Sequence, residues 1–357
     1  MAAYETAGRY RVGLALLFAV VLIWVGSSYL MHSIFGEQAF NKPFFITYVN
    51  TASLSLHLVI YFQSSKECRF ERQRRQQQQR QQQQREPEAE SDINLAPLTF
   101  VETAKVSAAF CLTWFAANSA SNSSLAYTTV ANSTILSSTS GIFTLMLGAY
   151  VGTESFVVSK LAAVASSFIG VYLVCNATPQ QATAISAMNE ITPTMIGNGL
   201  ALLGAVLYAA YTTLLKVRVG DERRINTPLF LGMVGVFNTV FLWLWLALMH
   251  YTGIEPFEWP PSAHIWGMII VNALIGTFLS DLCWMLAMLM TSPLVTTLGL
   301  SLTIPLALFG DVVFKHAILP PSYWVGSFLV VIGFIAINLS EQQIEDAITE
   351  IADVSIL

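Results

Sequence analysis

The chain has 357 residues, of which 54% are hydrophobic and only 11% are charged. Soluble domains usually carry about 25% charged residues, and the mean hydropathy is +0.58 although the chain includes a long polar insert. This balance excludes a soluble globular protein and predicts an all-α, polytopic membrane protein. The net charge of −5 says little about partners, because the distribution of charge matters more than its total in a membrane protein.

Ten apolar segments qualify as transmembrane helices, each of which needs roughly 20 apolar residues to cross the hydrocarbon core. Several have a proline at or near one end, where a missing backbone N–H costs least. In chain order the segments span residues 11–31, 44–62, 103–123, 128–150, 160–176, 195–216, 228–250, 265–288, 292–314 and 321–339.

The Lys and Arg residues predict which side of the membrane each loop faces. With the N-terminus in the cytoplasm, fifteen positive residues fall on the cytoplasmic side and two, Lys42 and Lys315, fall on the opposite side. Cytoplasmic loops carry an excess of Lys and Arg, so this bias supports an even number of spans. We therefore expect both termini in the cytoplasm.

Residues 63–97 interrupt the apolar pattern between the second and third segments. They contain an Arg-Gln-Arg-Arg run, two runs of four glutamines and an acidic patch. Such a composition cannot bury enough apolar area to fold, so we expect a disordered cytoplasmic loop. Its basic tract could contact anionic membrane lipid.

The two halves of the chain resemble one another. Gly-Leu-Ala-Leu-Leu occurs at 13–17 and again at 199–203, each time at the start of a predicted helix. About 164 residues separate a second match, in which Leu136, Ser137, Thr139 and Gly141 fall on Leu300, Ser301, Thr303 and Pro305. Since five helices per half is an odd number, the halves would insert in opposite orientations. Inverted repeats of this kind are typical of transporters whose site lies near the membrane midplane.

These observations predict the organisation of the chain. Residues 1–62 hold the first two helices of the first repeat, 63–97 the loop, 98–177 helices three to five, 178–194 a lumenal linker, 195–340 the second five-helix repeat and 341–357 a cytoplasmic acidic tail.

The stretch 113–150 carries no charge but is crowded with Asn, Ser and Thr. Small and hydroxylated residues let membrane helices approach closely and bond to one another, so tight packing and the lining of a site are both open interpretations. We interpret the stretch and its weaker copy near residue 300 as facing walls of one substrate site. The candidate residues are Asn118, Asn122, Asn132 and Ser137 in the stretch, and Ser301 and Thr303 in the copy.

Asp281 is an acidic residue within the apolar segment 265–288. Burying a charged carboxylate at mid-membrane costs at least ~2.5 kcal/mol, so such residues usually face a cavity or a partner. At helical spacing Thr277 and Trp284 share its face, and Ser280 lies at the edge of that face. The carboxylate could bind a cation or a hydroxyl group or couple transport to protons; a helix cap or structural hydrogen bond is the alternative.

Further candidates lie on the first and sixth predicted helices. Tyr208 and Lys216 align at helical spacing, and Trp24 and Ser27 are additional lining candidates. Lys216 could attract an anionic substrate, although a lysine at the end of a span commonly extends only to the lipid headgroups.

Five short motifs carry a family resemblance. They are Ile-Trp-Val-Gly-Ser-Ser at 23–28, Asn-Lys-Pro-Phe-Phe at 41–45, Leu-Ala-Tyr-Thr at 125–128, Leu-Ser-Ser-Thr-Ser-Gly at 136–141 and Leu-Ser-Leu-Thr-Ile-Pro-Leu at 300–306. Together they resemble the F subfamily of the solute carrier 35 transporters, in the drug/metabolite transporter superfamily. The resemblance covers essentially the whole chain except the glutamine-rich loop. It implies ten helices, cytosolic termini, EamA-type halves and alternating access.

The expected function is secondary transport of a small polar metabolite. A nucleotide-sugar-like anion, a thiamine-like cation and a nucleoside all stay open as substrates, although no cluster of arginines lies within the membrane to hold a phosphate. The expected partners are this solute and membrane lipid, with no nucleic acid, and the protein would be a monomer or homodimer. We expect an endomembrane location, in the Golgi or the vacuole or lysosome.

Two other functions compete with transport. A receptor or scaffold could use the charged loop or the acidic tail as a docking site. An intramembrane aspartyl protease would need Asp281 and Asp311 about 3 Å apart, but their helix positions separate them by roughly 16 Å along the membrane normal.

No Walker A motif, metal cluster or catalytic triad is visible, so we expect neither a cofactor nor enzyme activity.

Overall fold

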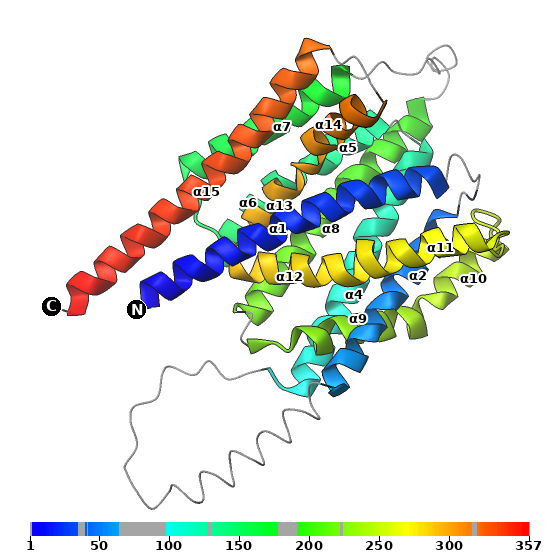
Figure 1. Ribbon diagram of the computed structural model, residues 1–357, viewed down its shortest axis with the longest axis horizontal. Coiled ribbons are helices and arrows are strands. Elements are labelled where there is room, and N and C mark those ends of the chain that lie inside the picture. Colours follow the sequence, from blue (N-terminus) through cyan, green and yellow to red (C-terminus); the bar gives the residue numbers. More distant parts are fainter. Residues whose placement is uncertain are drawn as a thin grey trace, which may run out of the picture.

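The protein is an all-α bundle in the computed structural model (Figure 1), which describes residues 2–34, 40, 42–63, 98–127, 130–177, 191–221, 224–315 and 320–356. Within these ranges the secondary structure is helical, without a strand, and nine helices are long and apolar enough to cross a membrane. A tenth, shorter apolar segment covers Pro293–Ala307. The prediction of an all-α polytopic membrane protein is confirmed. The predicted disordered loop and lumenal linker lie almost wholly outside the described residues.

The first five predicted helices correspond to the first group of elements. They are α1 (Ala2–His32), α2 (Pro43–Ser53) continued by η2 (Leu54–Leu56), α4 (Phe100–Tyr127), α5 (Val130–Ser138) with α6 (Ser140–Val151), and α7 (Val158–Ala177).

The second five correspond to the remaining elements. They are α8 (Ile191–Val219), α9 (Thr227–Phe241) with α10 (Trp243–Tyr251), α11 (Ala263–Val271) with the π-helix η5 (Asn272–Leu279) and α12 (Ser280–Met290), α13 (Pro293–Leu300) with α14 (Thr303–Lys315), and α15 (Pro321–Ile356). The helix α15 runs far beyond the predicted end at residue 339, so the residues expected as a tail continue the helix.

Two segments that were predicted as continuous helices are broken. Segment 128–150 is divided at Thr139, and segment 292–314 is divided at 301–302. The hydroxyls of Thr139 and Thr303 each donate to a carbonyl three residues earlier, and Pro305 lacks the N–H that a continuous helix needs. Because Thr139 corresponds to Thr303 in the sequence repeat, the two breaks lie at nearly equivalent positions.

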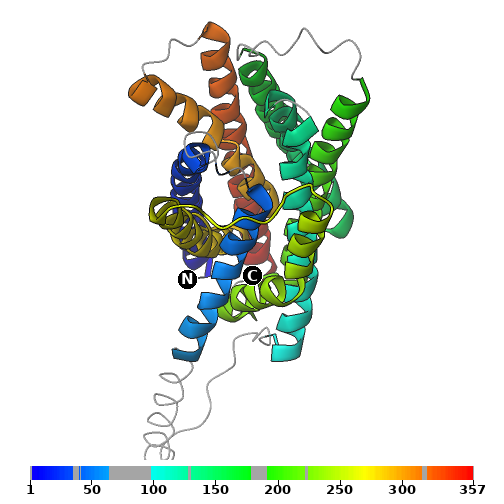
Figure 2. The ribbon, with the colours of Figure 1, turned by 90° about the vertical axis from the view of Figure 1, so that its right-hand side faces the viewer.

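Helices from the two halves pack against one another in reciprocal pairs. The third helix of the first half, α4, packs on α8, the first helix of the second half, and α12 packs on α1 in the same way. The fifth helices α7 and α15 pack on each other, as Figures 1 and 2 show. Their backbones meet at two glycines, because a Cβ on Gly170 would lie 2.5 Å from the Gly326 carbonyl oxygen.

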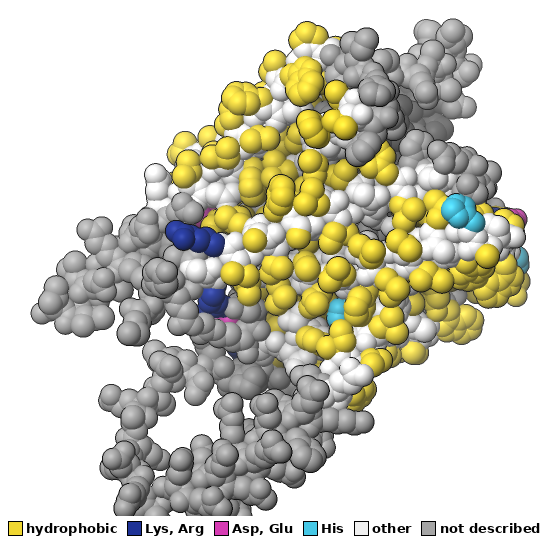
Figure 3. Space-filling view, viewed as in Figure 1, with side chains coloured by type: hydrophobic (Ala, Val, Ile, Leu, Met, Phe, Trp, Pro, Cys, Tyr) yellow, Lys and Arg dark blue, Asp and Glu magenta, His cyan; other side chains and the backbone are white. Residues whose placement is uncertain are grey.

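Among the described side chains seen in Figure 3, hydrophobic ones predominate, and the few charged ones lie near the edges of this face. Large hydrophobic side chains such as Leu112 and Phe328 are 62% and 65% exposed. A soluble protein would rarely expose so much continuous apolar surface, so this surface fits contact with lipid chains.

Candidate functional site

Asp281 is the second residue after the π-helix in the span formed by α11, η5 and α12. Such wider turns appear mostly as single-turn insertions within α-helices and frequently occur at functional sites. The π-helix packs closely on α1, where the Ser27 hydroxyl donates to Asn272 Oδ1. A Cβ on Gly276 would lie only 2.7 Å from Ser27 Oγ, so the glycine permits this approach.

The carboxylate of Asp281 faces a cavity of about 280 Å³, here called the aspartate cavity. Its walls come from both halves of the chain: α1, α2 and α4 from the first, and α8, η5 and α12 from the second. The lining contains one acidic side chain and, among the described residues, no Lys, Arg or His. The lining residues are Trp24, Thr47, Asn50, Trp114, Asn118, Tyr208, Tyr211, Gly276, Thr277, Asp281 and Trp284.

Five of these lining residues are aromatic, and neighbouring contacts fix several of them. The indole Nε1 of Trp24 donates to Ser280 Oγ at 3.1 Å. The ring centroids of Tyr208 and Tyr211 lie 5.1 Å apart, and those of Tyr211 and Trp284 lie 6.0 Å apart, both pairs edge to face. These contacts hold the aromatic wall in place.

Several polar atoms of the aspartate cavity lack a protein partner. No hydrogen bond or ion pair joins the Asp281 carboxylate to another residue in the described ranges. The amide oxygen of Asn50 is buried without a partner in the part of the chain described, whereas the Tyr208 hydroxyl lies beside Thr297 and the Trp284 indole N–H. Unpaired polar groups inside a membrane are costly, so Asp281 and Asn50 fit interactions with a solute or with water.

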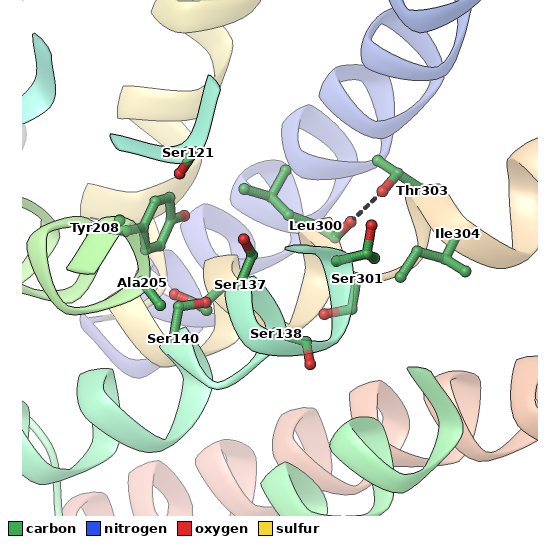
Figure 4. Close-up of a pocket in the computed structure, with 13 residues that line it drawn as sticks. Ser121, Ser137, Ser138, Ser140, Ala205, Tyr208, Leu300, Ser301, Thr303 and Ile304 are labelled. Atoms are coloured by element: carbon green, nitrogen blue, oxygen red, sulfur yellow. Dashed lines mark hydrogen bonds between the residues drawn. The ribbon is translucent and has the colours of Figure 1, made fainter. Parts of the chain in front are cut away.

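A second cavity of about 250 Å³, here called the hydroxyl cavity, lies at the two helix breaks. Figure 4 shows Ser137 and Ser140 on one side of it and Ser301 and Thr303 on the other. Tyr208 lines both cavities, so they are neighbours with one shared wall. The lining is uncharged and consists of Ser121, Thr134, Ser137, Ser138, Ser140, Gly204, Ala205, Tyr208, Thr297, Leu300, Ser301, Thr303 and Ile304.

The structure brings together nine of the predicted site residues in these two neighbouring cavities. Those in the aspartate cavity are Asp281, Trp284, Thr277, Asn118, Tyr208 and Trp24, and those in the hydroxyl cavity are Ser137, Ser301, Thr303 and again Tyr208.

The other predicted residues lie elsewhere. Ser280 and Ser27 are outside the linings of these two cavities and bond to Trp24 and Asn272. Lys216 lies outside both linings, and its Nζ donates to the carbonyls of Leu289 and Thr291 at the end of α12, at 2.9 and 3.0 Å. The side chains of Asn122 and Asn132 are outside the described residues.

The sequence prediction missed several lining residues, above all Trp114, Tyr211 and Thr47. Helical spacing could have identified all three. Trp114 precedes Asn118 by one turn, and Tyr211 follows Tyr208 by three residues, so each shares a face with a predicted residue. Thr47 likewise precedes Asn50 by three residues, and Asn50, a second-rank candidate from the sequence, lines the same cavity.

A buried ionic cluster ties the two halves together at one end of the bundle. Lys160 Nζ lies 2.7 Å from Glu154 Oε2 and 2.5 Å from Glu341 Oε1. The other carboxylate oxygen of Glu154 accepts from the N–H of Leu294, at the start of α13, at 3.2 Å. The side chains of Lys160 and Glu154 are 2% and 1% exposed. This ionic cluster therefore connects the α6–α7 loop and α7 with α13 and α15.

A second buried glutamate, Glu255, also connects the two halves, at the opposite ends of the helices. Glu255, in the loop between α10 and α11, accepts hydrogen bonds from the N–H groups of Phe44 and Phe45 at 3.0 and 2.9 Å. These groups begin α2, whose first turn favours a negative charge. Burial raises the pKa of Glu255 above its ordinary value of 4.5, although the two N–H groups and Lys42 oppose the shift.

The raised pKa of Glu255 predicts a pH dependence of stability. Because the folded protein binds this proton more tightly than the unfolded chain, stability should fall as pH rises from about 4.5 through the raised pKa. The variant Glu255→Gln should lack this fall. Melting temperatures of the two proteins across this range would test the prediction, with Glu258→Gln as a control at a 66% exposed carboxylate. Parallel curves for Glu255→Gln and the unaltered protein would contradict it.

Comparison with known proteins identifies relatives along nearly the whole chain, although no family model matches. The chain is 42% identical to the uncharacterized vacuolar membrane protein YML018C of Saccharomyces cerevisiae, over 96% of this chain and 94% of that protein. It is 41% identical to the uncharacterized transporter C405.03c of Schizosaccharomyces pombe, over 95% of this chain and 99% of that protein. It is 37% identical to the thiamine-repressible mitochondrial transport protein THI74 of Saccharomyces cerevisiae, over 92% of each.

An animal transporter and a solved structure extend these likenesses. Solute carrier family 35 member F5 of Macaca fascicularis is 39% identical over 68% of this chain and 55% of its own length. One crystal structure of another protein matches with a TM-score of 0.64 over 95% of this chain and 99% of that one, at 14% identity, and so shares the fold. Three of these relatives, C405.03c, THI74 and solute carrier family 35 member F5, carry the names of transporters. The chain is therefore an integral membrane transporter that belongs to solute carrier family 35, subfamily F.

Proposed function

We propose that the protein is a secondary-active transporter that moves a small polar metabolite by alternating access, with the solute bound between its two halves. One observation carries this proposal: an unpaired carboxylate, Asp281, faces a cavity whose walls come from both halves. An intramembrane ionisable residue facing a cavity is typical of a substrate or ion pathway.

The arrangement of helices supports two inverted five-helix repeats. In each half the third helix packs on the first helix of the other half: α4 on α8, and α12 on α1. Two repeats related by a twofold axis would make this pair of equivalent contacts. The breaks between α5 and α6 and between α13 and α14 lie at equivalent repeat positions. Discontinuous helices beside a cavity are common in transporters with this symmetry, because irregular backbone in a membrane is tolerated where it lines a cavity.

Alternating access requires contacts between the halves that can break. The ionic cluster of Glu154, Lys160 and Glu341 fits this requirement, because it joins loop and helix ends from both halves. The positive-inside bias assigns these ends to the cytoplasmic face. The cluster would then close the cytoplasmic side in this conformation, and its separation would accompany opening to the cytoplasm.

We propose an endomembrane location with both termini in the cytoplasm. The vacuolar relative supports this location, whereas another relative is named as mitochondrial. A fluorescent tag at the C-terminus would distinguish the organelles, and protease treatment of sealed vesicles would report the side on which the tag lies.

Transport is tested with purified protein in proteoliposomes loaded with a mixture of labelled metabolites. At least one small solute should exchange faster than in protein-free liposomes, and the same solute should raise the melting temperature of the protein. Correctly folded protein that exchanges none of them and is stabilised by none would overturn the proposal and favour a receptor or scaffold.

A further inference from the structure

We propose that the aspartate cavity binds an organic cation with a permanent positive charge on an alkylated nitrogen. This inference names the class of solute and so rests on the transport function proposed above. Three features of the cavity carry it: the sign of its charge, its aromatic walls and its uncharged neighbour.

The charge of the lining selects a positive ligand. Asp281 is acidic, the unpartnered Asn50 amide oxygen is a hydrogen-bond acceptor, and the described lining offers no Lys, Arg or His. A phosphate or carboxylate in the cavity would meet a like charge without a compensating cation, which is costly in a site of low dielectric constant. A cation instead gives the buried carboxylate the counter-charge that the described residues do not supply.

The walls favour an organic cation over a metal ion. The rings of Trp24, Trp114, Tyr208, Tyr211 and Trp284 surround the same cavity as the carboxylate. Aromatic faces attract cations that lie within about 6 Å of the ring centre, and aromatic cages are the usual way in which proteins hold quaternary ammonium groups. No group of three or more His, Cys, Asp or Glu in the described chain could hold a metal ion.

The hydroxyl cavity suggests where the rest of such a solute would lie. It shares Tyr208 with the aspartate cavity, and its lining is uncharged and rich in serine and threonine. A hydroxylated or otherwise neutral polar part of the molecule could bond there while the charged nitrogen stays beside Asp281. The volumes of about 280 and 250 Å³ limit each part to a small group.

The test measures binding at equilibrium, without transport, to the full-length protein in lipid nanodiscs. Isothermal titration calorimetry would compare choline with 3,3-dimethylbutan-1-ol, its neutral carbon isostere, and N-methylpyridinium with toluene. We expect each cation to bind at least about tenfold more tightly than its neutral partner, as cation–π contacts and a carboxylate together predict. Equal affinity within both pairs would overturn the inference.

Variants assign the effect to named residues. Asp281→Asn should weaken cation binding at least about tenfold while leaving the neutral isosteres unaffected, whereas the exposed control Glu258→Gln should change neither. Should Asp281→Asn not fold, Trp114→Leu and Trp114→Phe provide the comparison, because only the leucine variant removes the ring and should lose affinity. Unchanged cation affinity in the folded Asp281 variant, or equal affinity of the two Trp114 variants, would overturn the inference.

The binding test separates this inference from the transport proposal. Cation binding without flux in proteoliposomes would contradict transport and leave the cation site intact. Flux of another solute by a protein that does not discriminate the cations from their isosteres would contradict the cation site and leave transport intact.

Discussion

Replacing Lys160 by methionine is expected to lower the free energy of unfolding by about 3–5 kcal/mol, because removing one member of a buried ion pair leaves the other charge uncompensated. Here two carboxylates would remain, since Lys160 Nζ contacts both Glu154 and Glu341. The methionine retains most of the aliphatic volume, so lost packing is a minor part of the effect. A thermal melt of the purified protein in micelles measures the change as a lower melting temperature.

Glu258→Gln is the control for this prediction. The Glu258 carboxylate also pairs with a lysine, Lys42, at 3.3 Å, but it is 66% exposed. Exposed ion pairs contribute only about 0–1 kcal/mol, so this variant should melt close to the unaltered protein. Adding Glu154→Gln and Glu341→Gln to Lys160→Met removes all three charges and should recover most of the lost stability. Equal melting temperatures for Lys160→Met and Glu258→Gln would show that the buried ionic cluster is not a major source of stability.

The membrane class and most helices could be predicted from the sequence because they depend on local composition. An uninterrupted run of apolar residues is visible without any knowledge of its neighbours. The helix breaks at Thr139 and Ser301 were missed because hydropathy does not report hydroxyl-to-carbonyl bonds. Pro305 was the available signal, since a proline inside a predicted span disrupts the helix one turn earlier.

The candidate site was predictable in part for the same reason. Thr277, Asp281 and Trp284 are close in sequence, so helical spacing indicated one face, and all three line the aspartate cavity. Contacts between distant residues could not be predicted in this way. Lys160 was counted only as a cytoplasmic charge, yet it pairs with Glu341, 181 residues later. Lys216 was a candidate for anion binding, yet its ammonium bonds to carbonyls at the end of α12.

Replacing Asp281 by asparagine is expected to lower the rate of solute exchange at a fixed, subsaturating solute concentration by about 30-fold or more. For the cationic solute proposed above, this substitution removes the carboxylate that pairs with the solute. Removing one member of a buried charge pair in a binding site commonly costs about 2–5 kcal/mol, and each 1.4 kcal/mol is about a factor of ten. Asparagine keeps the size of the side chain and removes only its charge. Proteoliposome exchange, normalised to the amount of folded protein inserted, measures the loss.

Two control variants separate the charge from general effects of substitution. Asp221→Asn removes a carboxylate from the Arg9 ion pair, where the side chains are 25% and 32% exposed, and should leave exchange nearly unchanged. Ser137→Ala removes one neutral hydroxyl from the hydroxyl cavity and should reduce exchange by no more than about tenfold, because a neutral hydrogen bond contributes about 0.5–1.5 kcal/mol. The expected loss of exchange is therefore largest for Asp281→Asn, smaller for Ser137→Ala and smallest for Asp221→Asn. This ranking follows if the solute occupies the two cavities, because Asp281 and Ser137 line them and Asp221 does not. Full exchange by Asp281→Asn would remove the carboxylate from the transport mechanism, whatever the two controls do.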